Sequence, residues 1–338
     1  MIKKSIILCL LVLCFISVSF AENEVPVLYN ARLIKAAPLK EKPDKALENL
    51  TILSEKEKIE ILELYPDWVL IRTSKDKTGY IQRRYIDFNR VEPADPAITP
   101  RYPAILSEYI SWVNQETALR TEANSDSDAI ITLSPGVGLA IIGIENGWAK
   151  LIYHRQYAFV DSRHLSELMP LEPTAQNANS NAPIAAYTSF YRLTTDENNL
   201  NRILNISVAN ERMRPFVINP GETFDFNRDA GPYNKRAGYF PAFILVDGGS
   251  TLGYGGGTCQ VSSTLYNALL QLPGLSVEHR RPHGPGGAKY LPLHADAAVG
   301  NPVINLIFRN LYSFPVRIDG TAQDGALTIV IWPAENSI

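Results

Sequence analysis

The stretch GYGGGTCQVSSTLYNALLQ, residues 253–271, decides the fold of the C-terminal part of this chain. Three glycines lead into Cys259, and the apolar residues that follow recur with helical spacing as far as the turn-forming pair Pro273-Gly274. The pattern predicts a buried helix that starts at the cysteine. Cys259 lies roughly 140° from the middle of the apolar stripe, so we expect its thiol to point away from the main core contact. The stripe consists of Val261, Leu265, Ala268, Leu269 and Leu272.

Residues 1–21 have the features of a secretory signal peptide. A basic start is followed by an apolar run that is shorter than a membrane span, and small residues allow cleavage after Ala21. Cys9 and Cys14 lie inside this segment, so cleavage leaves Cys259 as the cysteine of the mature protein. The segment predicts export to a periplasm or cell wall, without a membrane span after cleavage.

The composition is that of an ordinary globular protein. The 338 residues are 46% hydrophobic with a formal net charge of -3, which leaves room for two or three domains. Because there is no basic excess, nucleic acid is excluded as an expected partner. The composition leaves the oligomeric state open.

Two stretches without apolar periodicity, residues 90–103 and 169–186, are rich in proline, alanine and small polar residues. Such composition is typical of linkers. They predict three domains, at residues 24–89, 104–168 and 187–338.

The two short domains share a pattern. In each, a turn leads to a tryptophan, Trp68 or Trp148, then to alternating strands, a polar turn and a hydrophobic close. The pattern resembles a tandem pair of small all-β bacterial SH3-like barrels, a class that commonly holds cell-wall enzymes near peptidoglycan. The alternative is that both tryptophans are core residues and nothing more.

The third domain combines helices with strands. Residues 198–213 carry a helical stripe of Leu200, Ile203, Leu204 and Val208, and residues 242–257 predict a strand, a Gly-Gly turn and a glycine-rich loop. Residues 302–310 and 326–332 predict closing strands. The expected fold class is α+β with a mostly antiparallel sheet.

A lone exported cysteine is either a buried, inert residue or a reactive one. The positive field at a helix start favours the thiolate form of a cysteine placed there. Gly256 and Gly257 bring no side chains, so a substrate backbone could approach, and backbone N–H groups at the helix start could hold an oxyanion. A tight structural turn is the alternative reading of the glycines.

A nucleophilic cysteine needs a base. His279, His283 and His294 follow downstream of Cys259, and Asp296 could orient one of them. A neutral histidine suits the role because its ordinary pKa is about 6.5.

Four motifs in this region match a family. NPGETFDFN, GGGTCQVSSTLYNALL, RRPHG and YLPLHADAAV resemble, in order, the motifs of the VanW family. The resemblance implies a cysteine L,D-transpeptidase that cross-links peptidoglycan stem peptides through an acyl-enzyme, with no cofactor and no metal. By motif position it implies Cys259 as the nucleophile, His283 as the base and Asp296 as the acid that orients it. His294 stands where the family usually has glycine, which makes it the alternative base.

Further residues in or beside these motifs are candidates for substrate binding or oxyanion stabilisation. Arg280 and Arg281 could hold a substrate carboxylate, or they could be a solvated charge pair. The candidates are Gly256, Gly257, Thr258, Gln260, Ser262, Ser263, Arg281 and Tyr290.

Two other functions share part of this pattern. An NlpC-type cell-wall cysteine endopeptidase also places SH3-like domains before a cysteine at a helix start, but resolves the acyl-enzyme with water. A non-catalytic peptidoglycan-binding module would use the two small domains and leave Cys259 buried.

Overall fold

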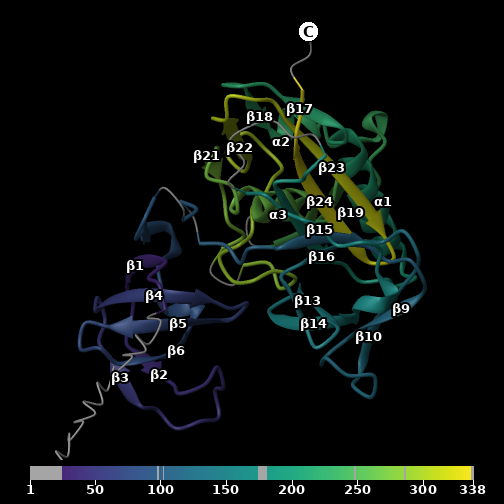
Figure 1. Cartoon of the computed structure of the whole chain (residues 1–338). Helices are drawn as coiled ribbons and strands as arrows, with labels where there is room; N and C mark the ends of the chain where they lie inside the picture. Colours follow the sequence, from purple (N-terminus) through teal and green to yellow (C-terminus); the bar gives the residue numbers. More distant parts are fainter. Residues whose placement is uncertain are drawn as a thin grey trace, which may run out of the picture.

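The computed structural model covers a mostly β protein. It describes residues 25–96, 99–101, 103–173, 181–246, 249–284 and 287–335. The predicted signal peptide, with Cys9 and Cys14, lies outside the described residues. Within them the chain forms antiparallel sheets and three α-helices (Figure 1).

The first β-rich segment forms a unit at the lower left of Figure 1. Its main sheet has the strand order β6-β5-β4-β1-β7, and β2 pairs with β3 beside it. Alternate residues of β5 are buried, as expected for a strand with one face on a core. The elements are β1 (Tyr29–Arg32), β2 (Ala37–Leu39), β3 (Thr51–Leu53), β4 (Lys58–Leu64), β5 (Trp68–Thr73), β6 (Thr78–Gln82), the 3-10 turns η1 (Arg83–Tyr85) and η2 (Phe88–Arg90), and β7 (Glu92–Pro93).

The second β-rich segment forms two sheets. Their strand orders are β10-β9-β14-β13-β12 and β11-β8-β15. The elements are β8 (Tyr109–Trp112), β9 (Thr117–Arg120), β10 (Ala129–Leu133), β11 (Gly138–Ile141), β12 (Gly143–Glu145), β13 (Trp148–Tyr153), β14 (Gln156–Asp161), η3 (Ser162–His164) and β15 (Met169–Pro170).

The two segments close in the same way. Each of the two predicted tryptophans begins the first strand of a hairpin, β5–β6 or β13–β14, and a 3-10 turn follows each hairpin. The chain then bridges back to the residue after the segment's first strand, Ile86 to Leu33 and Leu165 to Val113. The shared sequence pattern therefore corresponds to a shared local structure.

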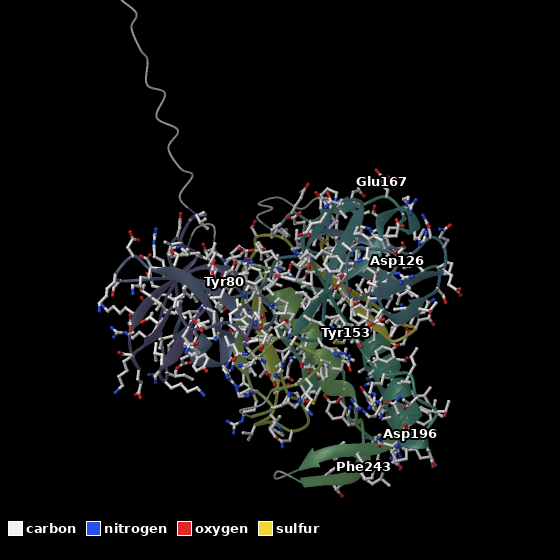
Figure 2. The ribbon with its side chains drawn as sticks, turned by 90° about the horizontal axis from the view of Figure 1, so that it is seen from below. Tyr80, Asp126, Tyr153, Glu167, Asp196 and Phe243 are labelled. Atoms are coloured by element: carbon white, nitrogen blue, oxygen red, sulfur yellow. The ribbon has the colours of Figure 1, made fainter. Side chains whose placement is uncertain are left out.

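The C-terminal segment surrounds helix α3 with strands. Its sheets have the orders β16-β24-β23-β17 and β18-β22-β21, and the hairpin β19–β20 projects from the body with Phe243 on it (Figure 2). The elements are β16 (Ala185–Phe190), α1 (Glu197–Arg212), β17 (Phe216–Ile218), β18 (Thr223–Asp225), α2 (Phe226–Asp229), η4 (Lys235–Ala237), β19 (Pro241–Val246), β20 (Gly249–Tyr254), α3 (Thr258–Leu269), β21 (Leu275–Arg280), β22 (Leu306–Asn310), β23 (Val316–Gln323) and β24 (Ala326–Pro333).

Helix α3 is buried all round. It packs on β16, β24 and α1, and each of its residues except Cys259 is buried. Its polar side chains are satisfied internally, as burial requires: Thr264 Oγ1 donates to the Gln260 carbonyl at 2.7 Å, and Gln271, just beyond the helix, donates to the Ala186 carbonyl at 2.8 Å. The single predicted apolar stripe therefore understates the burial, although the thiol does lie at the less buried point.

The second β-rich segment shares its interior with the C-terminal segment. One buried cluster joins Ile110, Ala140 and Leu171 to Ala186 and Val330. Hydrogen bonds cross the same boundary, from Ala140 N to Thr188 Oγ1 at 2.9 Å and from Thr328 Oγ1 to the Gly138 carbonyl at 2.6 Å. The two segments are thus packed together and not merely tethered.

The predicted linkers are partly ordered into sheets. β7 falls within residues 90–103 and pairs with β1, while β15 and the start of β16 fall within residues 169–186. Their backbone groups complete sheet edges, a role that composition alone does not indicate.

Two details of the C-terminal prediction were wrong. Residues 249–254 form strand β20 and not a loop. The stripe predicted for α1 is also not its buried face, because Leu200 and Leu204 are 46% and 43% exposed. Asn205 takes the buried position, where its Nδ2 donates to the carbonyls of Phe240 and Gly256 at 3.0 and 2.9 Å. The buried residues of α1 are Asn205, Ile206, Ala209 and Asn210.

Among the described residues, no helix combines the length and apolar character needed to cross a membrane.

Candidate active site

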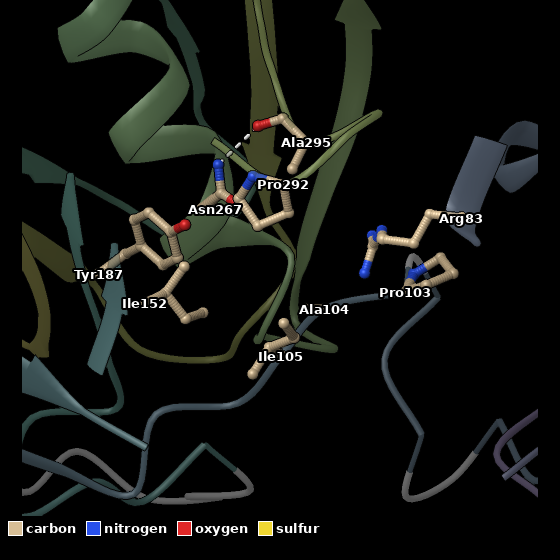
Figure 3. Close-up of a pocket in the computed structure, with 9 residues that line it drawn as sticks. All are labelled: Arg83, Pro103, Ala104, Ile105, Ile152, Tyr187, Asn267, Pro292 and Ala295. Carbon is tan, nitrogen blue, oxygen red and sulfur yellow. Dashed lines mark hydrogen bonds between the residues drawn. The ribbon is translucent and has the colours of Figure 1, made fainter. Parts of the chain in front are cut away.

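The chain after β21 folds back along α3. Ser263 Oγ accepts from Ala297 N at 2.9 Å, and Asn267 Nδ2 donates to the Ala295 carbonyl at 2.6 Å, the contact dashed in Figure 3. Ser262 Oγ donates to the Ala297 carbonyl at 2.6 Å. These contacts bring the segment that carries Asp296 against the helix.

Cys259 is the second residue of α3, so the helix begins one residue earlier than predicted. Its side chain is half-buried, and its sulfur lies 3.4 Å from both the carbonyl oxygen and the amide nitrogen of Val299. A thiol can donate to that oxygen, and a thiolate can accept from that N–H. The position thus accommodates both protonation states of the sulfur.

His283 connects Cys259 to Asp296. Its ring Nδ1 lies 2.7 Å from Asp296 Oδ2, and its backbone N–H donates to the same oxygen at 2.7 Å. Its side chain also lies close enough to Cys259 for the cysteine to raise its pKa. With Nδ1 held by the carboxylate, the other ring nitrogen is the one left for the sulfur.

The charges of this group support one another. Burial acts to lower the pKa of His283, but hydrogen bonds and charges from Asp296 and Cys259 outweigh it and raise the pKa from 6.5 to about 10. Burial likewise opposes ionisation of Asp296, yet the hydrogen bonds from His283 and the charge of Arg280 lower its pKa. The raised pKa favours the imidazolium form of His283 over the neutral form that we expected.

Arg280 serves Asp296 and is not available to a substrate. Its Nε donates to the Asp296 carbonyl at 2.7 Å, and its Nη2 donates to the His294 carbonyl at 3.0 Å and to Asp296 Oδ1 at 3.3 Å. The guanidinium also lies over the Tyr266 ring, 5.1 Å from its centroid. The expectation that it holds a substrate carboxylate is thus wrong for Arg280.

Arg281 remains a candidate for substrate binding. It is exposed, and its backbone pairs with Ala298 in an isolated bridge. Tyr290 also remains, because its half-buried side chain lies close enough to Cys259 for the charge of the cysteine to raise the tyrosine pKa, after the larger effect of burial.

The glycines before α3 serve internal packing. A Cβ on Gly256 would lie 2.6 Å from the Phe243 carbonyl oxygen, and one on Gly257 would lie 2.8 Å from the Arg202 carbonyl oxygen. Gly257 also has φ +112°, which favours glycine. The space left by the missing side chains is filled by the chain's own backbone and not kept open for a substrate.

Other predicted contacts of the helix start are likewise internal. The backbone N–H of Thr258 donates to Gly255 O at 3.1 Å, and that of Gln260 to Gly257 O at 2.9 Å, so neither amide is open to an oxyanion. The Gln260 side chain is buried and donates to Ser189 Oγ at 3.2 Å. Ser262 and Ser263 are buried in the contacts to Ala297, so these residues position the site and do not face a substrate.

His294 faces away from this chemistry. Its ring stacks on Phe88 with centroids 5.7 Å apart, and its backbone has a left-handed φ of 69°. Burial lowers its pKa, and its buried Nε2 has no hydrogen-bond partner among the described residues. Of the two candidate bases, His283 is the one hydrogen-bonded to Asp296.

Sequence reasoning missed two neighbours of the sulfur. Val299 contacts it through the backbone, and Tyr233 lies close enough for the charge of Cys259 to raise the tyrosine pKa, after the larger effect of burial. Tyr233 Oη donates to Asn227 Oδ1 at 2.7 Å. A contact made by the backbone of Val299 does not depend on the identity of its side chain, so the sequence does not indicate it. Tyr233 lies in a separate part of the chain, outside the motifs.

A surface pocket of about 370 Å³ opens at the turn between β13 and β14. It is lined by His154, Arg155, Gln156 and Lys289. Lys289, the residue before Tyr290, contributes a positive charge to this lining.

Comparison with known proteins identifies the segment that carries this site. Residues 201–332 match the family model described as "VanW like protein". This part of the chain is a VanW-like domain. The match does not extend to the N-terminal β-rich region.

Two curated relatives match part of this chain. "Uncharacterized protein YoaR" of Bacillus subtilis (strain 168) is 32% identical over 156 residues, which are 46% of this chain and 50% of that protein. "Vancomycin B-type resistance protein VanW" of Enterococcus faecalis (strain ATCC 700802 / V583) is 32% identical over 83 residues, 25% of this chain and 30% of that protein. The chain thus matches half or less of the length of these relatives.

Solved structures add no argument about the fold. The structure of NlpC2 from Trichomonas vaginalis aligns with a TM-score of 0.18 at 8% identity, covering 93% of this chain and 95% of that chain. An NlpC/P60 family protein from Bacillus cereus ATCC 10987 aligns with a TM-score of 0.17 at 12% identity, covering 90% and 94%. Scores this low do not show a common fold.

Proposed function

We propose that this protein is an exported cysteine L,D-transpeptidase that cross-links peptidoglycan stem peptides. The observation that carries the proposal is that His283 is hydrogen-bonded to Asp296 and lies close enough to Cys259 for the cysteine to raise its pKa. The likeness to a vancomycin resistance protein and the signal-like N-terminus support a role in the cell wall.

The first half of the reaction forms an acyl-enzyme. The Cys259 thiolate attacks the carbonyl carbon between the third residue of a donor stem and its terminal D-alanine. The C–N bond then breaks, and the leaving amine of D-alanine takes a proton from the His283 imidazolium. The donor stem is left as a thioester on Cys259.

The second half transfers the acyl group. An amine of a neighbouring stem attacks the thioester carbon while His283, now neutral, accepts a proton from that amine. The C–S bond breaks, the thiolate returns beside the imidazolium, and a new amide joins the two stems. Asp296 stays ionised throughout and stabilises the charged imidazole.

Positive groups at the rim suit an anionic substrate. Terminal D-alanine carries a carboxylate, and two exposed cations, Arg281 and Lys289, lie near His283 and Tyr290 in the chain. We propose that Arg281 and Lys289 attract that carboxylate.

The β-rich segments fit a role near the wall. Their common closure at Ile86 and Leu165 supports the proposal that they are tandem SH3-like domains that bind wall peptides. Both tryptophans are half-buried, so each also contributes to packing.

The test is incubation of the full chain with tetrapeptide muropeptides and analysis of products by mass spectrometry. We expect a cross-linked dimer that has lost one D-alanine, and an adduct on Cys259 that is absent from Cys259→Ala. Release of D-alanine without a dimer would instead assign a hydrolase of the endopeptidase kind. If neither the adduct nor a product is detected, the protein is a non-catalytic binding module.

A further inference from the structure

The segment that carries Asp296 is held from two sides. We call residues 287–297 the Asp296 loop. It contains no helix or strand in the residues that the structure describes there, so external contacts must fix its path. The rest of the VanW-like domain contacts one side of this loop, through Asn267, Ser263 and Arg280.

The outer side is bound by the first β-rich segment through Arg83. This arginine is 2% exposed, and its Nε donates to the Leu293 carbonyl at 3.3 Å. Its Nη1 donates to the Tyr65 carbonyl at 3.2 Å. Burial lowers the pKa of Arg83 to about 10, so it is still charged at neutral pH. A buried guanidinium is costly without its acceptors, so the Leu293 contact is a requirement of this arrangement.

Phe88 extends the same contact. The Arg83 guanidinium lies 4.5 Å from the Phe88 ring centroid, and the other partner of that ring is His294, whose left-handed backbone lies two residues before Asp296. Figure 3 shows Arg83 pointing from the first segment toward Pro292 of the loop. The first segment thus fixes the turn that leads into Asp296.

The second β-rich segment binds the loop through Arg155. This half-buried residue follows His154 in the turn between β13 and β14. Its Nε donates to the Leu291 carbonyl at 3.2 Å, and its Nη2 donates to the Ala288 carbonyl at 3.4 Å. Three carbonyls of the Asp296 loop are therefore bound by arginines from outside the VanW-like domain.

We propose that Arg83 and Arg155 are positioning residues, through which the two β-rich segments set Asp296 and thereby His283. The β-rich segments then help to position the candidate active site, in addition to their proposed binding of wall peptides. This inference rests on the proposed function only for its kinetic readout.

The experiment compares Arg83→Met and Arg155→Met with Arg84→Met in the full chain. Arg84 is a matched control because it lies in the same 3-10 turn as Arg83 but is exposed and contacts Tyr85. Arg155→Lys is the conservative variant, because it keeps the charge and a donor. The readouts are the titration of His283 by NMR, D-alanine release, and the unfolding temperature.

We expect Arg83→Met and Arg155→Met to lower kcat about tenfold to 100-fold, with little change in KM, since small misplacements of reacting groups have effects of that size. The His283 midpoint should fall from about 10 toward its ordinary value as Asp296 moves away. Arg155→Lys should recover part of both losses, and Arg84→Met should match the wild type.

A merely structural role predicts a different result. The variants would then lose unfolding temperature while the His283 midpoint and kcat stay at wild-type values, and that result would overturn the inference. If Arg83→Met does not fold, the comparison of Arg155→Met with Arg155→Lys tests the inference. Arg155 lies on a turn and is only half-buried, so we expect its variants to fold. If the wild type releases no D-alanine while the His283 midpoint still moves in the variants, the proposed function fails and the positioning role stands.

Discussion

One oxygen of Asp296, Oδ2, lies 2.7 Å from the backbone nitrogen of His283 and 2.7 Å from its ring Nδ1. The carboxylate therefore fixes both the main chain and the ring of the histidine. This double contact directs the remaining ring nitrogen to Cys259 and fixes the tautomer when the ring is neutral.

Removing the sulfur should end covalent chemistry without disturbing the fold. We expect Cys259→Ala to form no acyl-enzyme, because the nucleophile is gone, and to keep its unfolding temperature, because Cys259 is the half-buried residue of α3. Intact-mass analysis after incubation with muropeptides measures the first, and circular dichroism the second. Retained cross-linking in Cys259→Ala would falsify the proposed function.

The two histidines should differ sharply. We expect His283→Ala to lose most activity, on the order of 10²–10⁴-fold for a general acid–base group, and Asp296→Asn somewhat less. His294→Ala should have a mild effect, because its ring is not bonded to Asp296 and the bond from Arg83 to the Leu293 carbonyl remains. Steady-state D-alanine release measures all three. The reverse order, with His294→Ala inactive, would contradict the assignment of the base.

Stability should depend on pH through His283. Its pKa is raised from 6.5 to about 10 in the folded protein, so its stabilising contribution is complete below 6.5 and is lost as pH rises through about 10. Asp296, with a lowered pKa, contributes above its ordinary value of 3.8 and loses that contribution as pH falls through its folded value.

Urea unfolding across the alkaline range measures this dependence. The wild type should lose more free energy of unfolding than His283→Gln between neutral pH and about pH 10. Identical alkaline profiles for the two proteins would show that His283 is not charged in the folded state.

Substitutions of the adjacent residues Arg280 and Arg281 should affect different properties, stability in one case and substrate binding in the other. Arg280→Ala should reduce both stability and kcat, because loss of one partner from a buried ion pair costs about 3–5 kcal/mol. Arg281→Ala should keep stability and kcat but raise KM, as expected for lost substrate binding. Chemical unfolding and steady-state kinetics measure the pair, and an unchanged KM in Arg281→Ala rules out its proposed contact with the substrate carboxylate.

The glycines should behave as packing residues. Gly257→Ala should destabilise the fold by about 1–3 kcal/mol, since the backbone there is left-handed and the new Cβ would crowd Arg202. Gly143→Ala is the control, because no atom lies within 4 Å of its added Cβ, and such changes stay within about 0.5 kcal/mol. Urea unfolding measures both. If Gly257→Ala is as stable as the wild type and loses only substrate affinity, the glycine serves the substrate instead.

Much of the site was predictable from local pattern. The helix after the glycines follows from its periodicity, and the identities of Cys259, His283 and Asp296 follow from motif position. Local pattern did not predict the buried face of α1, because a polar residue occupies a core position there. Asn205 is buried and Leu204 is not, since the Asn205 amide donates to two loop carbonyls. Periodicity counts apolar residues and gives no information about such partners.

The sequence by itself predicted which residues are candidates for the chemistry, from their positions in motifs, and where most helices and strands lie, because periodicity depends on side chains that are near in the chain. The tertiary structure alone decided that His283 and not His294 binds Asp296, and that Gly256 and Gly257 make room for the protein's own backbone. It also decided that Arg83, more than two hundred residues before Leu293, reaches the Asp296 loop. The glycine and Arg83 outcomes depend on contacts to backbone carbonyls that are distant in the chain, and every residue has such a carbonyl, so the sequence does not indicate which one is used.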